Sequence, residues 1–81
     1  MANKTNVSMN FEIGLLLQKA RESKGITQRE ISEHTGFSKN HISDVERGLS
    51  KASVELLLGY CEILDLDPNT ILTFNIKKGL P

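Results

Sequence analysis

Residues 39–44 bring together four polar side chains that could hydrogen-bond the edges of nucleobases. Lys39 can donate to guanine O6 and N7, and Asn40 can pair with adenine through two hydrogen bonds. Asp44 can accept from cytosine N4, and Ser43 can donate or accept at either partner. Asp44 also repels phosphate, so it would penalise wrong sequences as well as favour right ones. These residues are candidates for reading DNA bases, provided that one exposed helix face presents them together.

Two short helices would have to position these side chains. Thr27 and Glu30 have the spacing of a capping box, which starts a helix by satisfying two free backbone N–H groups. Gly36 ends that helix, Ser38 can cap a second one, and Gly48 ends the second. The apolar residues that can converge on one interior are Ile31, Phe37, Ile42 and Val45. Two short helices joined by a tight turn form a helix-turn-helix, whose second helix enters the DNA major groove.

The remaining segments are predicted to pack around the same core. The predicted helices cover residues 10–24, 27–35, 38–47, 53–64 and 67–72. We therefore predict an all-α fold, a compact five-helix bundle that contains the helix-turn-helix. The expected organisation is a flexible N-terminal arm (1–9), the DNA-binding domain (10–73) and a C-terminal tail (74–81). In the tail, Phe74 and Ile76 alternate with polar residues, which predicts a brief strand or a packed tail.

The positive and negative charges of the chain cancel, but they are distributed unevenly along the sequence. The 81 residues form one small domain with a formal net charge of zero. Residues 1–51 carry eight basic and six acidic side chains, whereas residues 52–81 carry two basic and four acidic ones. Phosphate contacts are short-ranged at cellular salt, so the local charge of an interface matters more than the total. The first part of the chain is thus compatible with double-stranded DNA as a partner.

Several other classes are disfavoured by the composition. No stretch approaches the ~20 apolar residues of a membrane span, and residues 1–10 lack the apolar run of a signal peptide. The single Cys61 cannot form an intrachain disulfide and fits a reducing cytoplasm, where we expect the protein. Cys61 and the two histidines lack metal-ligand spacing, so no metal site is expected. The sequence contains no catalytic or phosphate-loop motif, which argues against an enzyme and against a cofactor.

With these features in place, the chain resembles the phage repressor/Cro-like helix-turn-helix family, the XRE family of bacterial regulators. The similarity spans about Ile13–Leu72 and rests on the order and spacing of several features. They are Gly14, Arg21, Gly25-Ile26-Thr27-Gln28, Gly36, Phe37-Ser38, Ile42-Ser43, Glu46-Arg47-Gly48 and Leu64-Asp65-Leu66-Asp67. The resemblance implies a sequence-specific transcriptional regulator, with repression as the default and activation left open.

The resemblance also implies roles for individual residues. Lys39, Asn40 and Asp44 match positions that touch base edges, with Ser43 in support. Arg21 and Glu46 match an ion pair that ties the first helix to the end of the recognition helix. Gln28 and the loop that follows the recognition helix match positions that contact phosphate. His41 lies near the start of the recognition helix and could also approach phosphate. The candidate phosphate contacts are Gln28, Ser38, His41, Arg47, Ser50 and Lys51.

Two features depart from the family pattern, and a third is a surplus of apolar residues. Ser32 and Thr35 stand where small or aliphatic residues are usual, and backbone hydrogen bonds could accommodate them. Ala52 replaces a common proline. The apolar residues that exceed the needs of a small core are Leu15, Leu16, Phe74, Ile76 and Leu80. Either the tail folds back over the first helix, or the protein forms a homodimer; we favour the dimer, which predicts a pseudo-palindromic operator.

A competing interpretation keeps the fold but changes the partner. The zero net charge and the extra leucines of the first helix would suit a module that binds an unknown protein instead of DNA. An antitoxin or a controller-type protein could use the same fold.

Overall fold

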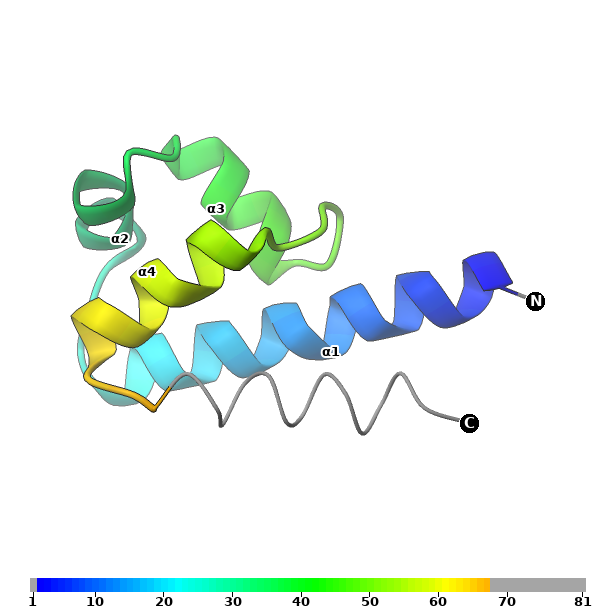
Figure 1. Cartoon of the computed structure of the whole chain (residues 1–81), viewed down its shortest axis with the longest axis horizontal. Coiled ribbons are helices and arrows are strands. Elements are labelled where there is room, and N and C mark those ends of the chain that lie inside the picture. Colours follow the sequence, from blue (N-terminus) through cyan, green and yellow to red (C-terminus); the bar gives the residue numbers. More distant parts are fainter. Residues whose placement is uncertain (1, 68–81) are drawn as a thin grey trace.

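The computed structural model describes the backbone of residues 2–67 and the side chains of residues 9–67. This part of the chain contains four α-helices and no strand: α1 (Ala2–Ser23), α2 (Gln28–Thr35), α3 (Lys39–Glu46) and α4 (Val54–Leu64). The long α1 runs along one side of the molecule, and the three shorter helices lie together against it (Figure 1). Both α3 and α4 pack on α1 and α2. The all-α class is therefore confirmed.

The helix count and the start of the first helix differ from the predictions. Four helices are present in the described residues, so the five-helix bundle is not supported. The predicted fifth helix lies outside the described residues except for Asp67, as does the tail with Phe74 and Ile76. α1 begins at Ala2, not at Asn10, so the predicted arm boundary is not a boundary of secondary structure. Residues 2–13 contain no glycine or proline, and nothing in the backbone interrupts the helix there.

The core forms where the apolar sides of the four helices meet. The largest fully buried side chains are those of Leu17, Ile31, Ile42, Val45, Leu56, Tyr60 and Leu64. Each large apolar side chain removed from water contributes roughly 1.5–3 kcal/mol. Because Ile31 comes from α2 and Ile42 from α3, this core fixes the two helices of the predicted helix-turn-helix relative to each other.

Gly14 lets α1 approach α3 very closely. A Cβ atom at this position would lie 2.2 Å from the carbonyl oxygen of Val45 and 2.8 Å from that of Glu46. Both neighbours are backbone atoms at the end of α3, so neither can swing away as a side chain could. The two helices can therefore meet at their present separation only if this position has no side chain.

Replacing Gly14 by alanine should therefore destabilise the fold, although alanine is the better helix former. Overpacking of this kind costs typically about 1–3 kcal/mol, which exceeds the ~1 kcal/mol gained in helix propensity. Chemical denaturation of the Gly14→Ala variant would measure the loss. Lys19→Ala, at an exposed position of the same helix, is the control and should change stability by less than about 0.5 kcal/mol. Equal stability of the two variants would mean that the helices can separate at no cost.

Candidate nucleic-acid interface

The start of α2 is set by the capping box predicted from the sequence. The backbone N–H of Glu30 donates to Thr27 Oγ1 at 3.1 Å, and the backbone N–H of Thr27 donates to Glu30 Oε1 at 2.9 Å. Gln28 is the first residue of the helix and follows this cap directly. The cap thus fixes where the Gln28 side chain leaves the backbone, beside the free N–H groups of the first turn.

The turn between α2 and α3 is held by side chains that the sequence marked as departures. Gly36 takes the left-handed conformation, with φ of 84°, and reverses the chain. Ser32 Oγ donates to the carbonyl of Phe37 at 2.6 Å, and the backbone N–H of Phe37 donates to Thr35 Oγ1 at 3.2 Å. Thr35 Oγ1 also donates to the carbonyl of Ile31 at 2.8 Å. The two hydroxyl residues are accommodated by backbone hydrogen bonds, as expected, and they tie the turn to α2.

The four predicted base readers lie on the side of α3 that faces away from the core. Ile42, Val45 and Glu46 are the buried residues of this helix. Lys39 and Asn40 are exposed, and Ser43 and Asp44 are half-buried. Ser38 caps the helix, its hydroxyl accepting from the backbone N–H of His41 at 3.1 Å. The arrangement places an ammonium, an amide, a hydroxyl and a carboxylate on one side of a short helix.

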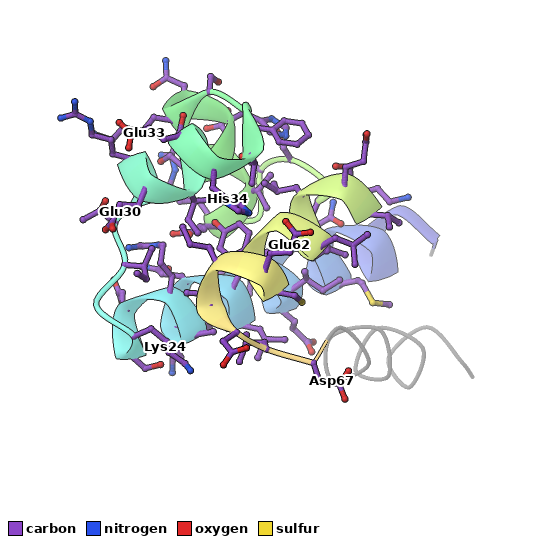
Figure 2. The ribbon with its side chains drawn as sticks, turned by 60° about the vertical axis from the view of Figure 1, so that its left-hand side comes forward. Lys24, Glu30, Glu33, His34, Glu62 and Asp67 are labelled. Atoms are coloured by element: carbon purple, nitrogen blue, oxygen red, sulfur yellow. The ribbon has the colours of Figure 1, made fainter. Side chains whose placement is uncertain are left out.

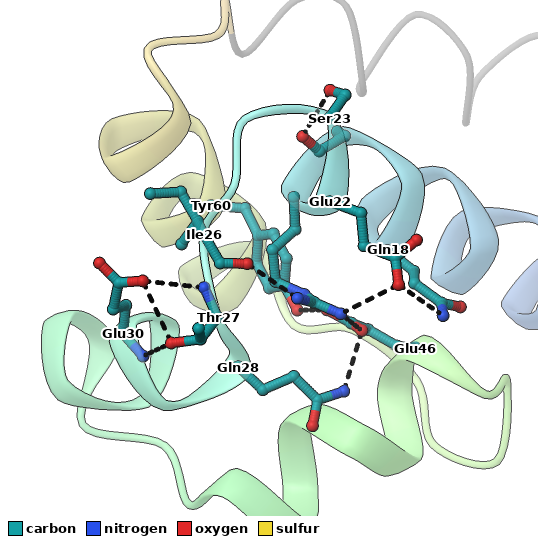
Figure 3. A network of polar contacts seen from close by, with 11 residues as sticks. Gln18, Glu22, Ser23, Ile26, Thr27, Gln28, Glu30, Glu46 and Tyr60 are labelled. Atoms are coloured by element: carbon teal, nitrogen blue, oxygen red, sulfur yellow. Dashed lines mark hydrogen bonds and ion pairs between the residues drawn. The ribbon is translucent and has the colours of Figure 1, made fainter.

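A buried polar network holds the end of α3 against α1, α2 and α4 (Figure 3). The structure contains the expected ion pair: Arg21 Nε donates to Glu46 Oε2 at 2.8 Å, and Arg21 Nη2 donates to Glu46 Oε1 at 3.0 Å. Arg21 Nη1 also donates to the carbonyl of Ile26 at 2.8 Å. Gln28 Nε2 donates to Glu46 Oε1 at 3.0 Å, and the hydroxyl of Tyr60 donates to Glu46 Oε2. Glu46 is only 3% exposed, and its carboxylate is hydrogen-bonded by three other side chains.

The network shifts the pKa values of its members in directions that follow from these contacts. Burial by itself would raise the pKa of Glu46, but the hydrogen bonds from Arg21, Tyr60 and Gln28 outweigh it and hold that pKa below its usual value. The hydrogen bond to Glu46 raises the pKa of Arg21, although burial opposes this. Burial, followed by the neighbouring carboxylate, raises the pKa of Tyr60. Glu46 and Arg21 are therefore both charged at neutral pH.

Acid should weaken the fold through Glu46. The unfolded chain releases the Glu46 proton near the ordinary value of 4.5, and the folded chain releases it at a lower pH. Between these two pH values only the unfolded state binds the proton, so stability present above about pH 4.5 is lost as the pH falls. Glu46→Gln should be less stable at neutral pH but lose less on acidification. Thermal melts at several pH values would show this, with Glu33→Gln, at an exposed position, as the control. The prediction is contradicted if the melting temperatures of Glu46→Gln and of the parent chain fall in parallel as the pH is lowered.

Sequence reasoning missed Tyr60 as a polar member of this network. The spacing of Tyr60 from Leu56, Leu57 and Leu64 indicates only an apolar, buried position, and Tyr60 is indeed fully buried. A buried tyrosine hydroxyl normally needs a hydrogen-bond partner, and this rule was the available signal. The sequence did not indicate which residue, 14 positions away, would accept the bond.

The predicted phosphate contacts lie in different environments. Gln28 is half-buried, and its amide nitrogen donates to Glu46, so it braces α3 as well as standing at the start of α2. His41 stacks on Phe37, with ring centroids 5.4 Å apart. Arg47 Nη2 donates to Asp44 Oδ1 at 2.8 Å, which joins a candidate phosphate contact to a candidate base reader. Ser50 and Lys51 lie in the loop between α3 and α4, where Lys51 is exposed.

Among the described residues, no other group of side chains is arranged as clearly for a function as those of α3. Within them, no group of three His, Cys, Asp or Glu side chains could hold a metal ion. No helix of the described part has both the length and the apolar character to cross a membrane. Cys61 is buried, and burial raises the pKa of its thiol.

Comparison with known proteins agrees with this geometry. A family model described as helix-turn-helix matches residues 17–71. The transcriptional regulator ClgR of Mycobacterium tuberculosis is 38% identical over 60 residues, which cover 74% of this chain and 54% of ClgR. The chain thus spans about half the length of that curated relative.

Two solved structures are similar in fold as well as in sequence. The clp gene regulator ClgR from Corynebacterium glutamicum is 30% identical with a TM-score of 0.75, and the match covers 85% of this chain and 73% of that one. The restriction-modification controller protein C.AhdI from Aeromonas hydrophila is 26% identical with a TM-score of 0.70. That match covers 76% of this chain and 94% of C.AhdI.

Proposed function

The chain belongs to the helix-turn-helix family of phage repressor/Cro type, and we propose that it is a sequence-specific DNA-binding transcriptional regulator. The observation that carries the proposal is the presentation of α3. Its outward side bears Lys39, Asn40, Ser43 and Asp44, while its inward side is locked by a buried ion pair with α1. A rigid helix that carries hydrogen-bond donors and acceptors on its outward side is what base reading in a major groove requires.

The proposed contacts divide into those that position the protein and those that read sequence. Phosphate contacts from Gln28, Ser38 and Lys51 would set the register of the protein on the duplex, with His41, Arg47 and Ser50 adding to them. Lys39, Asn40 and Ser43 would then meet base edges, together with Asp44. Because only part of this surface is basic, we expect weak non-specific binding and a clear preference for particular sequences.

We further propose that two copies bind one operator. Phe11 is 55% exposed and Leu15 is 37% exposed on α1, which is more apolar surface than one small domain needs to leave in water. A two-fold dimer would read two half-sites about 34 Å apart, so its operator would be pseudo-palindromic. Such a dimer would repress by occupying DNA that polymerase needs.

Selection from genomic DNA tests the function directly. The purified chain would be incubated with fragmented genomic DNA near 0.15 M salt, and the retained fragments would be sequenced. Enrichment of one inverted repeat would support a dimeric, sequence-specific regulator. Enrichment of a single, unrepeated motif would overturn the proposed dimer but would still support sequence-specific DNA binding. Absence of enrichment, even at low salt, would overturn the proposal.

Asp44 should act mainly on specificity. The Asp44→Asn change removes a charge that repels phosphate and frees Arg47, so one more cation can meet the backbone. One added phosphate contact corresponds to about fivefold tighter binding of random duplex near 0.15 M salt, while the preference for the operator falls. Fluorescence anisotropy on both duplexes at several salt concentrations measures this. Glu33→Gln, which removes an exposed carboxylate paired with Arg29, is the matched control. An unchanged ratio of affinities would contradict the assigned role of Asp44.

A second candidate function is a protein-interaction module with the same fold. Its support is the zero net charge together with the exposed Phe11 and Leu15. This function predicts that changes on α3 leave binding to the partner intact, whereas changes at Leu15 weaken it.

A further inference from the structure

α4 turns an acidic stripe toward solvent. Glu55, Leu58 and Glu62 follow one another at intervals of three or four residues, so they lie along one side of the helix, and Asp65 follows at its C-cap. All four are exposed, and the Leu58 side chain is 41% exposed in the middle of the carboxylates. In Figure 2, Glu62 points outward from α4 and His34 of α2 lies next to it. Leu58 is thus a large apolar side chain that lies exposed among carboxylates.

Two shallow hollows flank this stripe. A hollow of about 390 Å³ lies between α2 and α4 and is lined by Phe37, Leu58, Gly59 and Glu62, among others. A second one of about 320 Å³ continues past the end of α4, where Leu58, Cys61 and Leu66 provide apolar lining. Leu58 and Glu62 line both, so the hollows are neighbours along one side of the helix. The two hollows thus form an open groove along α4, lined by apolar and polar side chains together.

The charge of the groove is only partly compensated. Residues 52–67 contain four carboxylates and no lysine or arginine. Glu62 Oε1 lies 3.0 Å from His34 Nε2. Glu55 and Asp65 make no ion pair with any of the residues that the structure describes. Uncompensated negative charge therefore remains at both ends of the groove.

We infer that this α2/α4 groove is a docking site for a basic amphipathic helix of another protein. The distance along α4 from Glu55 to Asp65 is about 15 Å, at 1.5 Å per residue, and matches roughly three turns of a partner helix. One apolar side chain of that helix would cover Leu58, while lysines or arginines on either side would meet Glu55 and Asp65. This is the helix-in-groove mode of recognition, with charge setting orientation and partner choice.

The groove shares no residue with the proposed DNA surface, and the two adjoin where Phe37 stacks on His41. α3 packs on α1 and α2, and α4 packs on α2 and α1, whereas α3 and α4 meet through the buried hydrogen bond from Tyr60 to Glu46. The groove residues come from α4, the end of α2 and the turn, whereas the base readers all belong to α3. A bound partner and a bound duplex could therefore be held at the same time, which would let the partner act at the operator.

Titration of the ¹⁵N-labelled full chain with synthetic peptides tests the inference. The probe is an amphipathic peptide of about three helical turns, with leucines on one side and lysines on the other. Two controls accompany it: the same pattern with glutamates in place of lysines, and oligolysine of equal length. Backbone amide shifts should move in α4 and at the end of α2 with the probe, and only weakly with either control.

Variants of exposed groove residues make the result decisive, because none of them is part of the core. Leu58→Ala and Glu55→Gln should each weaken binding of the probe severalfold, and Glu22→Gln on α1 should not change it. The probe should also bind when the chain is already on its selected duplex. The inference would be overturned if oligolysine bound as tightly as the probe, or if the amide shifts were confined to α1 or α3. It would also be overturned if Leu58→Ala bound the probe like the parent chain, or if DNA displaced the probe.

Discussion

Replacing both Lys39 and Asn40 by alanine is expected to abolish sequence preference while leaving the fold intact. Each good base contact discriminates by about 1–3 kcal/mol, so losing two lowers affinity for the preferred duplex roughly 30-fold to more than 10,000-fold. Both side chains are exposed on α3 and take no part in the buried network, so the melting temperature should barely change. Affinity for the selected operator and for random duplex would be measured by anisotropy, with circular dichroism as the check on folding.

Lys51→Ala is the matched control for this double variant. Lys51 is exposed in the loop after α3, and its proposed contact is with phosphate. Removing it should weaken operator and random duplex alike and reduce the salt slope by about one. The double variant should instead bring the operator down to the affinity of random duplex. If it keeps its preference for the operator, α3 is not the reading helix.

Replacing Arg21 by leucine is the change expected to cost the most stability. The substitution leaves the Glu46 carboxylate, 3% exposed, without its guanidinium partner. Breaking a buried pair by removing one partner costs about 3–5 kcal/mol, out of roughly 4–12 kcal/mol for a domain of this size. The melting temperature should fall by roughly 12–40 °C. Because the pair anchors the end of α3, DNA binding should be lost at temperatures where the parent chain still binds.

Arg29→Leu provides the comparison for Arg21→Leu. Arg29 pairs with Glu33 at 3.3 Å, but the side chains are 81% and 66% exposed. An ion pair in water is worth at most about 1 kcal/mol, so this variant should melt within a few degrees of the parent. Thermal melts of both variants in the same buffer decide the question. Similar losses for the two would mean that the buried pair contributes no more than a solvated one.

The sequence by itself determined the local architecture and which side of α3 is free to meet a partner. The capping box at Thr27 and Glu30, the left-handed Gly36 and the Ser38 cap act within four residues, so their outcome can be predicted without knowing the tertiary fold. The spacing of Ile31, Ile42 and Val45 decided which side of each helix is buried, and hence which side is free. The family resemblance supplied the pairing of Arg21 with Glu46, which no local rule contains.

Only the tertiary structure decided how these parts combine. The contacts of Glu46 with Arg21, Gln28 and Tyr60 join residues 25, 18 and 14 positions apart, and each contact connects two different helices, so spacing within one helix does not predict it. The extent of α1 was also mispredicted, because the polar residues before Asn10 carry no stop signal and no strong start signal either. The acidic groove exists because α2 and α4 lie side by side. Leu58 lies there between carboxylates that come from different turns of α4. Local signals fix short-range backbone geometry, whereas networks and grooves depend on which helices the core brings together.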